Sequence, residues 1–404
     1  MRRVVLDPTS HNNAPDRADA GACPPHPVTV APRTPRSDVR FLTTVLPTSG
    51  GSTRSGLELA RHVAAAGHDV HVVSWRLPDL AHLDPATGPP ASTPDNLTWH
   101  FLPEPGLRMP VHDELTTPRF AALLASVMDD LDVDVANIHY LVPALLAVPQ
   151  RHLHRCIASG RGSDVNDLPA DLWQQVAERL AAVRAVTAAS PHLAELMASR
   201  FDTKSVHVIP SPAPDPPADL EAARSAVRST LEVTADVVLV HVSTMLPRKQ
   251  PAHCLDALAA ARAAGHDAAL VLIGDGPELA TTLQLAHELG LKDHVVATGY
   301  RDDAHGLLVG ADVVLVPSLS EGTPRAAIEA LAAGVPVVGY DIPGLSELVG
   351  PAGALADPYD RTALAVATVE VLTSRPPAEL ARSRVVHLDR GQVMRTWTDL
   401  LDLG

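Results

Sequence analysis

Short apolar runs alternate along this chain with longer stretches in which apolar residues recur at helical spacing. The first run, residues 39–45, predicts a buried strand, and the helix pattern that follows over residues 57–64 ends near Gly67. The runs have little polar alternation, which is typical of parallel strands that helices cover on both faces of a sheet. The predicted strands span residues 39–45, 69–75, 133–140, 156–159, 185–189, 206–209, 237–243, 268–273, 295–298, 313–316 and 335–340.

A proline-rich segment, residues 210–217, interrupts this alternation and can continue neither a sheet nor a helix. Two doubly wound α/β domains that face a central cleft are therefore expected, with ligands at the carboxyl ends of the strands. The predicted division is a disordered tail (1–37), an N-terminal Rossmann-like domain (38–210), a linker (211–235), a C-terminal Rossmann-like domain (236–375) and final helices (376–404) that pack back on the N-terminal domain.

Composition removes several classes of protein. Hydrophobic residues make up 46% of the 404 residues, which is ample for two cores, but no apolar run is long enough to predict a membrane span. The formal charge of −15 argues against nucleic acid or an anionic membrane as a partner. The three cysteines are far apart and form no C-x-x-C pair, which favours reduced thiols and a cytoplasmic location.

The most informative segment follows the strand at residues 313–316. A polar turn carries Glu321, a helix is predicted to start near Thr323 with Pro324 inside its first turn, and Glu329 follows eight residues after Glu321. Free amides and the dipole at that helix start favour an anion. Glu329 lies in an otherwise apolar helix with no cation at i+4, so either it binds a ligand or it is a solvated helix residue.

A second segment, residues 241–250, also follows a strand. Lys249 lies there although the chain has only three lysines, and a cation at the carboxyl end of a strand can neutralise a diphosphate leaving group. The alternative is that Arg248 and Lys249 are solvent-exposed loop residues without a functional role. In the first half, Gly50 and Gly51 would let a ligand approach the backbone, although such turns also connect strands to helices without any function.

The segment from Glu321 to Pro336 resembles the E-x7-E signature of family four retaining glycosyltransferases, which have the GT-B fold. Residues 274–278 and 299–303 resemble two further motifs of that family, and the likeness covers roughly residues 39–375. Within the family, residues 47–52, 71–77, 138–143 and 162–165 resemble most the N-acetylglucosaminyl L-malate synthases of bacillithiol biosynthesis and, less closely, the mycothiol glycosyltransferases.

The resemblance implies roles for particular residues. Glu321 and His139 would orient the donor sugar, Glu329 the ribose, and Lys249 the leaving phosphates. Further donor contacts would come from Gly322, Thr323, Pro324, Arg325, Arg248, Thr244, Gly274, Tyr300 and Arg301. The acceptor and phosphate loops would contain Gly50, Gly51, Ser52, Arg54, Arg161 and Asp164.

Two positions depart from the family pattern. Thr244 stands where the family usually has an arginine, and residues 323–325 read Thr-Pro-Arg where the most similar members have Phe-Gly-Leu. Pro324 has no backbone N–H to offer a sugar hydroxyl. The identity of donor and acceptor is therefore left open.

The sequence thus predicts a retaining transferase that moves a sugar from a UDP- or GDP-linked donor to a small acceptor, anionic or thiol-containing, in thiol or secondary-metabolite biosynthesis. No metal or other cofactor is expected, because Asp132 and Asp134 lie at a helix–strand boundary and His152 and His154 have no third ligand nearby. A homodimer is compatible with the sequence. The alternatives are a nucleotide-sugar epimerase or hydrolase on the same fold, and a non-catalytic nucleotide-sugar-binding protein.

Overall fold

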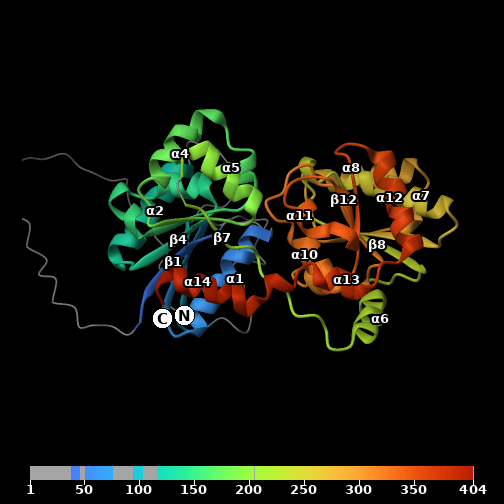
Figure 1. Ribbon diagram of the computed structural model, residues 1–404, viewed down its shortest axis with the longest axis horizontal. Helices are drawn as coiled ribbons and strands as arrows, with labels where there is room; N and C mark the ends of the chain where they lie inside the picture. Colours follow the sequence, from blue (N-terminus) through green and yellow to red (C-terminus); the bar gives the residue numbers. More distant parts are fainter. Residues whose placement is uncertain (1–37, 46–50, 76–93, 103–115, 204, 404) are drawn as a thin grey trace, which may run out of the picture.

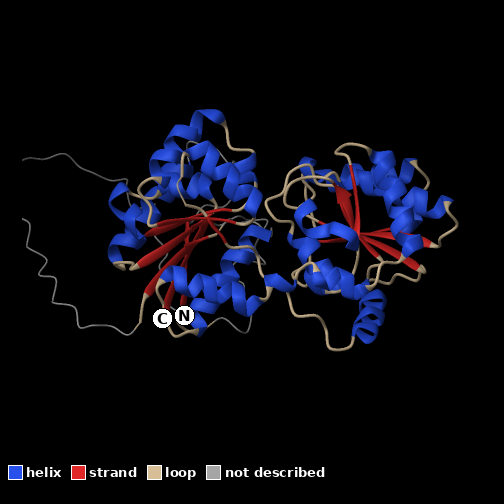
Figure 2. Cartoon of the chain, viewed as in Figure 1, coloured by secondary structure: helices blue, strands red, loops and turns tan. Residues whose placement is uncertain are grey.

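The computed structural model describes residues 38–45, 51–75, 94–102, 116–203 and 205–403. These residues form two parallel sheets, and helices cover both faces of each sheet (Figures 1 and 2). The predicted class, two doubly wound α/β domains, is confirmed. The predicted tail over residues 1–37 and Gly50 lie outside the described residues.

The N-terminal sheet has seven parallel strands in the order β3-β2-β1-β4-β5-β6-β7. Its strands are β1 (Arg40–Thr44), β2 (Asp69–Trp75), β3 (Leu97–Leu102), β4 (Val135–His139), β5 (Cys156–Gly160), β6 (Ala185–Ala188) and β7 (His207–Val208). The helices that cover it are α1 (Gly51–Ala65), α2 (Thr116–Asp130), α3 (Ser163–Asn166), α4 (Trp173–Leu180) and α5 (Pro191–Phe201). The strand order reverses between β1 and β4, and such a switch point opens a crevice at the carboxyl ends of the strands.

The C-terminal sheet has six parallel strands in the order β10-β9-β8-β11-β12-β13. Its strands are β8 (Val237–Val242), β9 (Ala268–Ile273), β10 (Val295–Gly299), β11 (Val313–Val316), β12 (Val337–Tyr340) and β13 (Gly353–Ala356). The helices are α6 (Leu220–Thr230), α7 (Cys254–Ala263), α8 (Pro277–Glu288), α9 (Ala304–Leu307), α10 (Arg325–Ala332), α11 (Ser346–Val349), α12 (Arg361–Ser374) and α13 (Ala378–Ser383). Here the strand order reverses between β8 and β11.

Neighbouring residues of a strand supply the cores on opposite faces of the sheet. Phe41 and Leu42 of β1 are both fully buried, but Phe41 packs in one hydrophobic cluster and Leu42 in another. This is the two-residue period of a strand that is covered on both faces. The positions of the site loops are therefore fixed by strands buried on both sides.

The last helix, α14 (Arg390–Leu401), returns to the N-terminal domain and lies beside α1 (Figure 1). Val393, Met394, Trp397 and Leu401 recur at helical spacing and are buried in the same cluster as Phe41. His62 of α1 also contacts the Thr398 hydroxyl at 3.1 Å. The end of the chain thus ties the two domains together.

Among the helices and strands that were not predicted are β3, α3, α6, α11 and β13. The helix α6, within the segment expected to be a linker, has no fully buried residue, and only Val227 packs in part against the C-terminal core. Its polar side chains also hold it, since Arg224 and Arg228 both pair with Asp312 of the C-terminal domain. The strand β13 is Gly-Ala-Leu-Ala, which carries little strand propensity.

Candidate active site

A cleft of about 850 Å³ lies between the two domains, at the carboxyl ends of both sheets. Its walls come from the loops after β4, β5, β8, β9, β10 and β11, from the segments after β6 and β7, and from the first turn of α1. Every site residue that the sequence predicted and the structure describes lines this cleft, with the exception of His139. A cleft of this size can hold a ligand as large as a nucleotide sugar.

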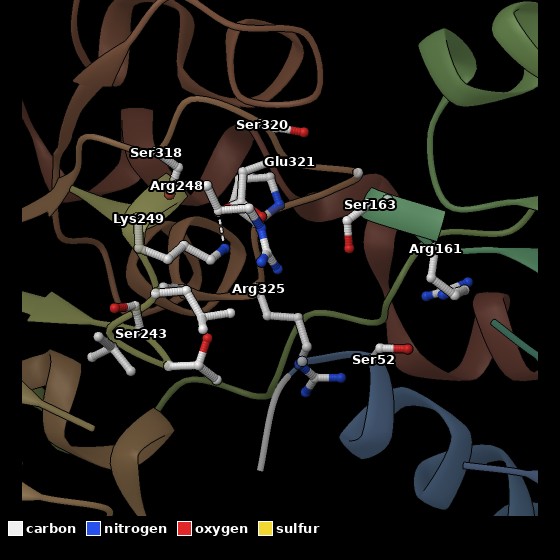
Figure 3. A pocket seen from close by; sticks show the side chains of 18 of the residues that line it. Ser52, Arg161, Ser163, Ser243, Arg248, Lys249, Ser318, Ser320, Glu321 and Arg325 are labelled. Carbon is white, nitrogen blue, oxygen red and sulfur yellow. Dashed lines mark hydrogen bonds and ion pairs between the residues drawn. The ribbon is translucent and has the colours of Figure 1, made fainter. Parts of the chain in front are cut away.

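An ion pair joins two of these loops at the second switch point. Lys249 Nζ lies 2.5 Å from Glu321 Oε1, and both side chains are 13% exposed (Figure 3). The two loops are also joined through their backbones, because the Leu319 N–H donates to the Arg248 carbonyl at 2.9 Å. The pair therefore has a fixed position on the wall of the cleft.

His241, which the sequence did not predict as a site residue, holds the turn that leads to Lys249. Its Nδ1 lies 2.9 Å from the Leu315 carbonyl, which can only accept, so Nδ1 carries the proton and Nε2 accepts from the Ser243 hydroxyl at 2.9 Å. The Ser243 oxygen in turn accepts from the Met245 N–H at 3.0 Å. Burial, and then the charge of Lys249, lower the pKa of His241 to about 4, so the ring is neutral at pH 7.

The loop after β9 packs backbone against backbone on this turn. Gly274 has φ +124°, and a Cβ there would lie 1.8 Å from the Ser243 carbonyl oxygen. The geometry therefore requires glycine at this position. Thr244 lines the cleft beside this loop.

The loop after β11 differs from its prediction in one respect. The helix α10 begins at Arg325 rather than near Thr323, and Pro324 precedes it as an extended N-cap residue with ψ 108°. The Thr323 hydroxyl, instead of capping the helix, donates to the Ala189 carbonyl of the N-terminal domain at 2.8 Å. The first amides of α10 still lack intrahelical acceptors, as at any helix start.

Gly322 lies where the backbones of the two domains are in contact. A Cβ at Gly322 would lie 2.0 Å from the Arg161 carbonyl oxygen, so no larger residue fits while the domains are in contact. Asn166 adds a second contact, because its Nδ2 donates to the Glu321 carbonyl at 3.0 Å. The loop that carries Glu321 therefore packs directly against the N-terminal domain.

Arg325 links the domains through a pair of carboxylates. Its guanidinium donates two hydrogen bonds to Glu58 of α1, at 2.8 and 3.1 Å, and its Nε lies 3.3 Å from Glu329 Oε1. The sequence prediction that Glu329 has no cation at i+4 holds, but the cation lies at i−4. Burial alone would lower the pKa of Arg325, yet Glu58 and Glu329 outweigh burial and raise that pKa. Glu58 was not predicted as a site residue.

On the N-terminal side, the expected loop of Gly51, Ser52 and Arg54 is the first turn of α1. The helix begins earlier than its apolar pattern does, because small and polar residues, Thr53 and Ser55 among them, form its buried face there. Arg54 reaches across the cleft and donates to the Asp302 carbonyl at 2.6 Å. Its charge is therefore engaged by the C-terminal domain.

Arg161 is also engaged. Its guanidinium donates to the Ser55 hydroxyl at 2.9 Å, the Ser211 hydroxyl at 3.1 Å and the Ile209 carbonyl at 3.2 Å. Burial lowers the pKa of Arg161 to about 10, which still leaves it charged at pH 7. Arg161 holds the segments that follow β5 and β7 together at the edge of the cleft.

Asp164 fixes the turn after β5. It accepts from the backbone N–H groups of Leu141, Arg161 and Gly162 at 2.8 to 2.9 Å. Burial nonetheless raises the pKa of Asp164 above its usual value. The carboxylate therefore organises backbone and is not directed at a ligand.

Tyr140 and Ser163 line the cleft without having been predicted. The Tyr140 hydroxyl lies 2.5 Å from Ser163 Oγ, and Tyr140 has φ 89°, which is strained for a residue with a side chain. A signal for both was present in the sequence, since they lie in the stretches 138–143 and 162–165 that resemble the family, although Tyr140 was placed inside the strand that ends at His139.

His139 lies beneath α1 and not on the wall of the cleft. It is 1% exposed. Its ring lies against Gly56 of α1, and a Cβ built on Gly56 would lie 3.3 Å from the His139 ring. Burial, followed by the charge of Arg161, holds the pKa of His139 well below its usual value. The ring is neutral, and its contact with a donor sugar stays a prediction.

Metal and membrane can be addressed for the part of the chain that the structure describes. In those residues no three His, Cys, Asp or Glu side chains gather closely enough to hold a metal ion. Metal independence itself stays a prediction. None of the described helices combines the length and apolar character that crossing a membrane requires.

Two family models match the chain: Glycosyltransferase Family 4 over residues 49–215 and Glycosyl transferases group 1 over residues 224–384. The protein belongs to the glycosyltransferases that these models describe, and its fold is GT-B. The resemblance that the motifs indicated is confirmed.

Among similar proteins, the N-acetyl-alpha-D-glucosaminyl L-malate synthase of Bacillus anthracis is 26% identical over 86% of this chain and 92% of its own length. The 2-deoxystreptamine glucosyltransferase of Streptomyces kanamyceticus is 33% identical over 44% of this chain and 47% of its own length. The Anabaena protein HepE, solved with UDP and glucose, has a TM-score of 0.70 at 17% identity, and the match covers 90% of this chain and 99% of HepE. That structural likeness supports the fold.

Proposed function

We propose that the protein transfers a sugar from a nucleotide diphosphate donor to a small acceptor, with retention of the anomeric configuration and without a metal ion. The observation that carries this proposal is the buried Lys249–Glu321 pair beside the start of α10, with Glu329 on the same wall of the cleft. Together these groups offer a cation and helix amides for a diphosphate and a carboxylate for ribose hydroxyls.

Arg248 is the proposed second cation for the diphosphate, in place of the arginine that Thr244 replaces. Arg248 lines the cleft, and Figure 3 shows its side chain directed into it near Glu321. Its guanidinium has no hydrogen-bond or ion-pair partner among the described residues, so the charge is available to a ligand. Arg54, Arg161 and Arg325, by contrast, already donate to protein groups.

In the proposed reaction, the bond between the sugar C1 and the leaving phosphate oxygen breaks while an acceptor oxygen or sulfur bonds to C1 on the same face. The acceptor proton passes to the departing phosphate oxygen. Lys249 and Arg248 stabilise the negative charge that develops on the diphosphate. Glu321 is paired with Lys249 and orients the sugar, so no carboxylate nucleophile is assigned.

The acceptor is proposed to be a small polyhydroxy compound held by the N-terminal side of the cleft. The names of the relatives above mention L-malate and 2-deoxystreptamine. Because Arg54 and Arg161 are engaged by protein groups, an acceptor without a carboxylate fits the described residues at least as well as an anionic one.

The test is a proton NMR assay with UDP- and GDP-linked hexoses and N-acetylhexosamines, EDTA, and a panel of malate, inositol, aminocyclitols and small thiols. The proposal predicts one donor–acceptor pair that yields a glycoside with the anomeric coupling of the donor. An inverted product would contradict retention. Nucleotide release that no acceptor accelerates would instead identify a hydrolase, and an epimerised donor would identify an epimerase.

A further inference from the structure

The contact between Glu58 and Arg325 joins the two domains at the wall of the cleft. Glu58 lies on α1 and Arg325 begins α10, and the side chains are 19% and 11% exposed. Figure 3 shows Arg325 extending from α10 toward the helix that carries Ser52, which is α1. A bidentate arginine–carboxylate pair with this little exposure has a defined geometry and a strong directional preference.

The first turn of α1 is shaped to receive this arginine. A Cβ at Gly51 would lie 2.9 Å from Arg325 Cδ and 3.1 Å from Arg325 Cγ. Gly51 and Glu58 are seven residues apart, which is two helical turns, and they lie on the same face of α1. That face of α1 therefore offers both space for the aliphatic part of the Arg325 side chain and a carboxylate that pairs with its guanidinium.

The same arginine also contacts Glu329, the residue proposed to bind ribose. Arg325 Nε lies 3.3 Å from Glu329 Oε1, while Oε2 has no hydrogen-bond partner among the described residues. The Glu329 side chain is 6% exposed and lines the cleft. With Glu58 holding the two terminal nitrogens of Arg325, one oxygen of Glu329 is fixed and the other is left for a ligand.

We propose that Glu58 and Arg325 are positioning residues: their bridge across the closed cleft orients Glu329 and makes tight binding of the donor ribose depend on contact between the domains. This inference rests on the proposed function. When Glu58 is absent or withdrawn, Arg325 can turn both terminal nitrogens toward Glu329 and occupy the two oxygens that the ribose needs. Donor binding and domain contact then favour each other, as linkage requires.

The bridge depends on the arginine at position 325 in particular. A side chain without a cation at that position could not pair with a carboxylate on α1, so Glu58 would have no partner there. The coupling therefore depends on two residues that are 267 positions apart and on the glycine that seats one of them.

The experiment is isothermal titration calorimetry on the full chain with UDP, GDP, ADP and dTDP. The nucleotide that binds is then repeated as its 2′,3′-dideoxy analogue, which lacks the hydroxyls that Glu329 would accept. The variants are Glu58→Gln and Glu58→Asp, with Glu347→Gln as the matched control. Glu347 also joins the domains, because its Oε1 accepts from the His192 N–H at 3.3 Å, but it does not contact Arg325.

Glu58→Gln is expected to weaken nucleotide binding about tenfold, the value of one hydrogen bond to a charged group. The dideoxy analogue should show little of this loss, and Glu58→Asp should recover part of it, whereas a merely structural role would weaken both ligands alike. Glu347→Gln should bind as the wild type does. If Glu58→Gln does not fold, Glu58→Asp and the dideoxy comparison still decide.

Equal affinity in wild type and Glu58→Gln, or an equal loss in Glu347→Gln, would overturn the inference and leave the proposed function standing. A loss that is the same for the ribose and dideoxy ligands would overturn it as well. A wild type that binds none of the nucleotides would overturn the proposed function together with the inference.

Discussion

The carboxylate of Glu321 and the ammonium of Lys249 lie 2.5 Å apart on loops that follow adjacent strands, β11 and β8. Each side chain compensates the burial of the other, so removal of either leaves a charge without its partner. In the proposed reaction both act on the donor, Lys249 on the leaving phosphates and Glu321 on the sugar.

Replacement of either residue should lower turnover sharply, and it should also lower stability, because the remaining charge loses its partner. We expect Glu321→Gln and Lys249→Ala each to lower kcat by about 10²–10³, the usual effect of losing one group that stabilises developing charge. Steady-state kinetics and circular dichroism measure the two effects. Lys292→Ala is the matched control, because Lys292 precedes β10 and lies away from the cleft. Near-normal turnover of Glu321→Gln would contradict the role assigned to Glu321.

Arg248 should matter for the donor more than for the fold. Arg248→Ala is expected to raise the KM for the donor about tenfold, since the variant loses one charge-assisted hydrogen bond to the diphosphate. Placing an arginine at the family position, Thr244→Arg, in the Arg248→Ala background should recover part of this loss. An unchanged donor KM in Arg248→Ala would show that the second cation comes from elsewhere.

Substitution of Gly322 tests whether contact between the domains is required for activity. A Cβ at Gly322 would overlap the Arg161 carbonyl, 2.0 Å away, so Gly322→Ala should hold the domains apart while leaving each core intact. We expect kcat/KM to fall at least about tenfold and the radius of gyration in small-angle scattering to increase. Gly306→Ala is the control, because a Cβ there meets nothing within 4 Å. Full activity of Gly322→Ala would mean that the contact is dispensable.

The buried neutral ring of His241 predicts a pH effect on stability. Its folded pKa of about 4 lies below the ordinary histidine pKa of about 6.5, so the unfolded chain takes up a proton first as pH falls. No contribution exists above about pH 6.5, and between that pH and about 4 the free energy of unfolding should fall by up to about 3 kcal/mol from this residue.

Urea unfolding between pH 7.5 and 4 measures this effect. His241→Gln should flatten the pH dependence, whereas the exposed His387→Gln should leave it as in the wild type. If the free energy of unfolding of His241→Gln depends on pH in the same way as that of the wild type, His241 does not carry the effect. His100, whose pKa burial also lowers to about 4, contributes in the same direction and remains in both variants.

Much of the fold could be predicted because the signal is local. Each buried strand is an apolar run in itself, so β2, for example, has the bounds that the pattern gave. The helix α6 could not be found in that way, since it buries no residue fully and is held by Asp312, far along the chain. The strand β13 was not predicted because it consists mostly of small residues, and its place in the sheet depends on pairing with β12.

The site was predictable where a residue follows a strand and less so elsewhere. Glu321 and Lys249 lie at strand ends, where the architecture collects ligand-binding groups. Glu58 lies within a helix, and its significance depends on a partner on the other domain. The start of α10 was placed too early because Pro324 suits a first helical turn, while here it is extended and Thr323 is drawn to Ala189.

The most direct test of the central claim is a thermal shift measurement with UDP, GDP, ADP and dTDP in the presence of EDTA, on the wild type and on Glu329→Gln. We predict that one nucleoside diphosphate raises the unfolding temperature of the wild type without metal, and that the shift is much smaller in Glu329→Gln. No shift with any of the four, or a shift that needs a divalent cation, would contradict the assignment of this cleft to a metal-independent nucleotide-sugar transferase.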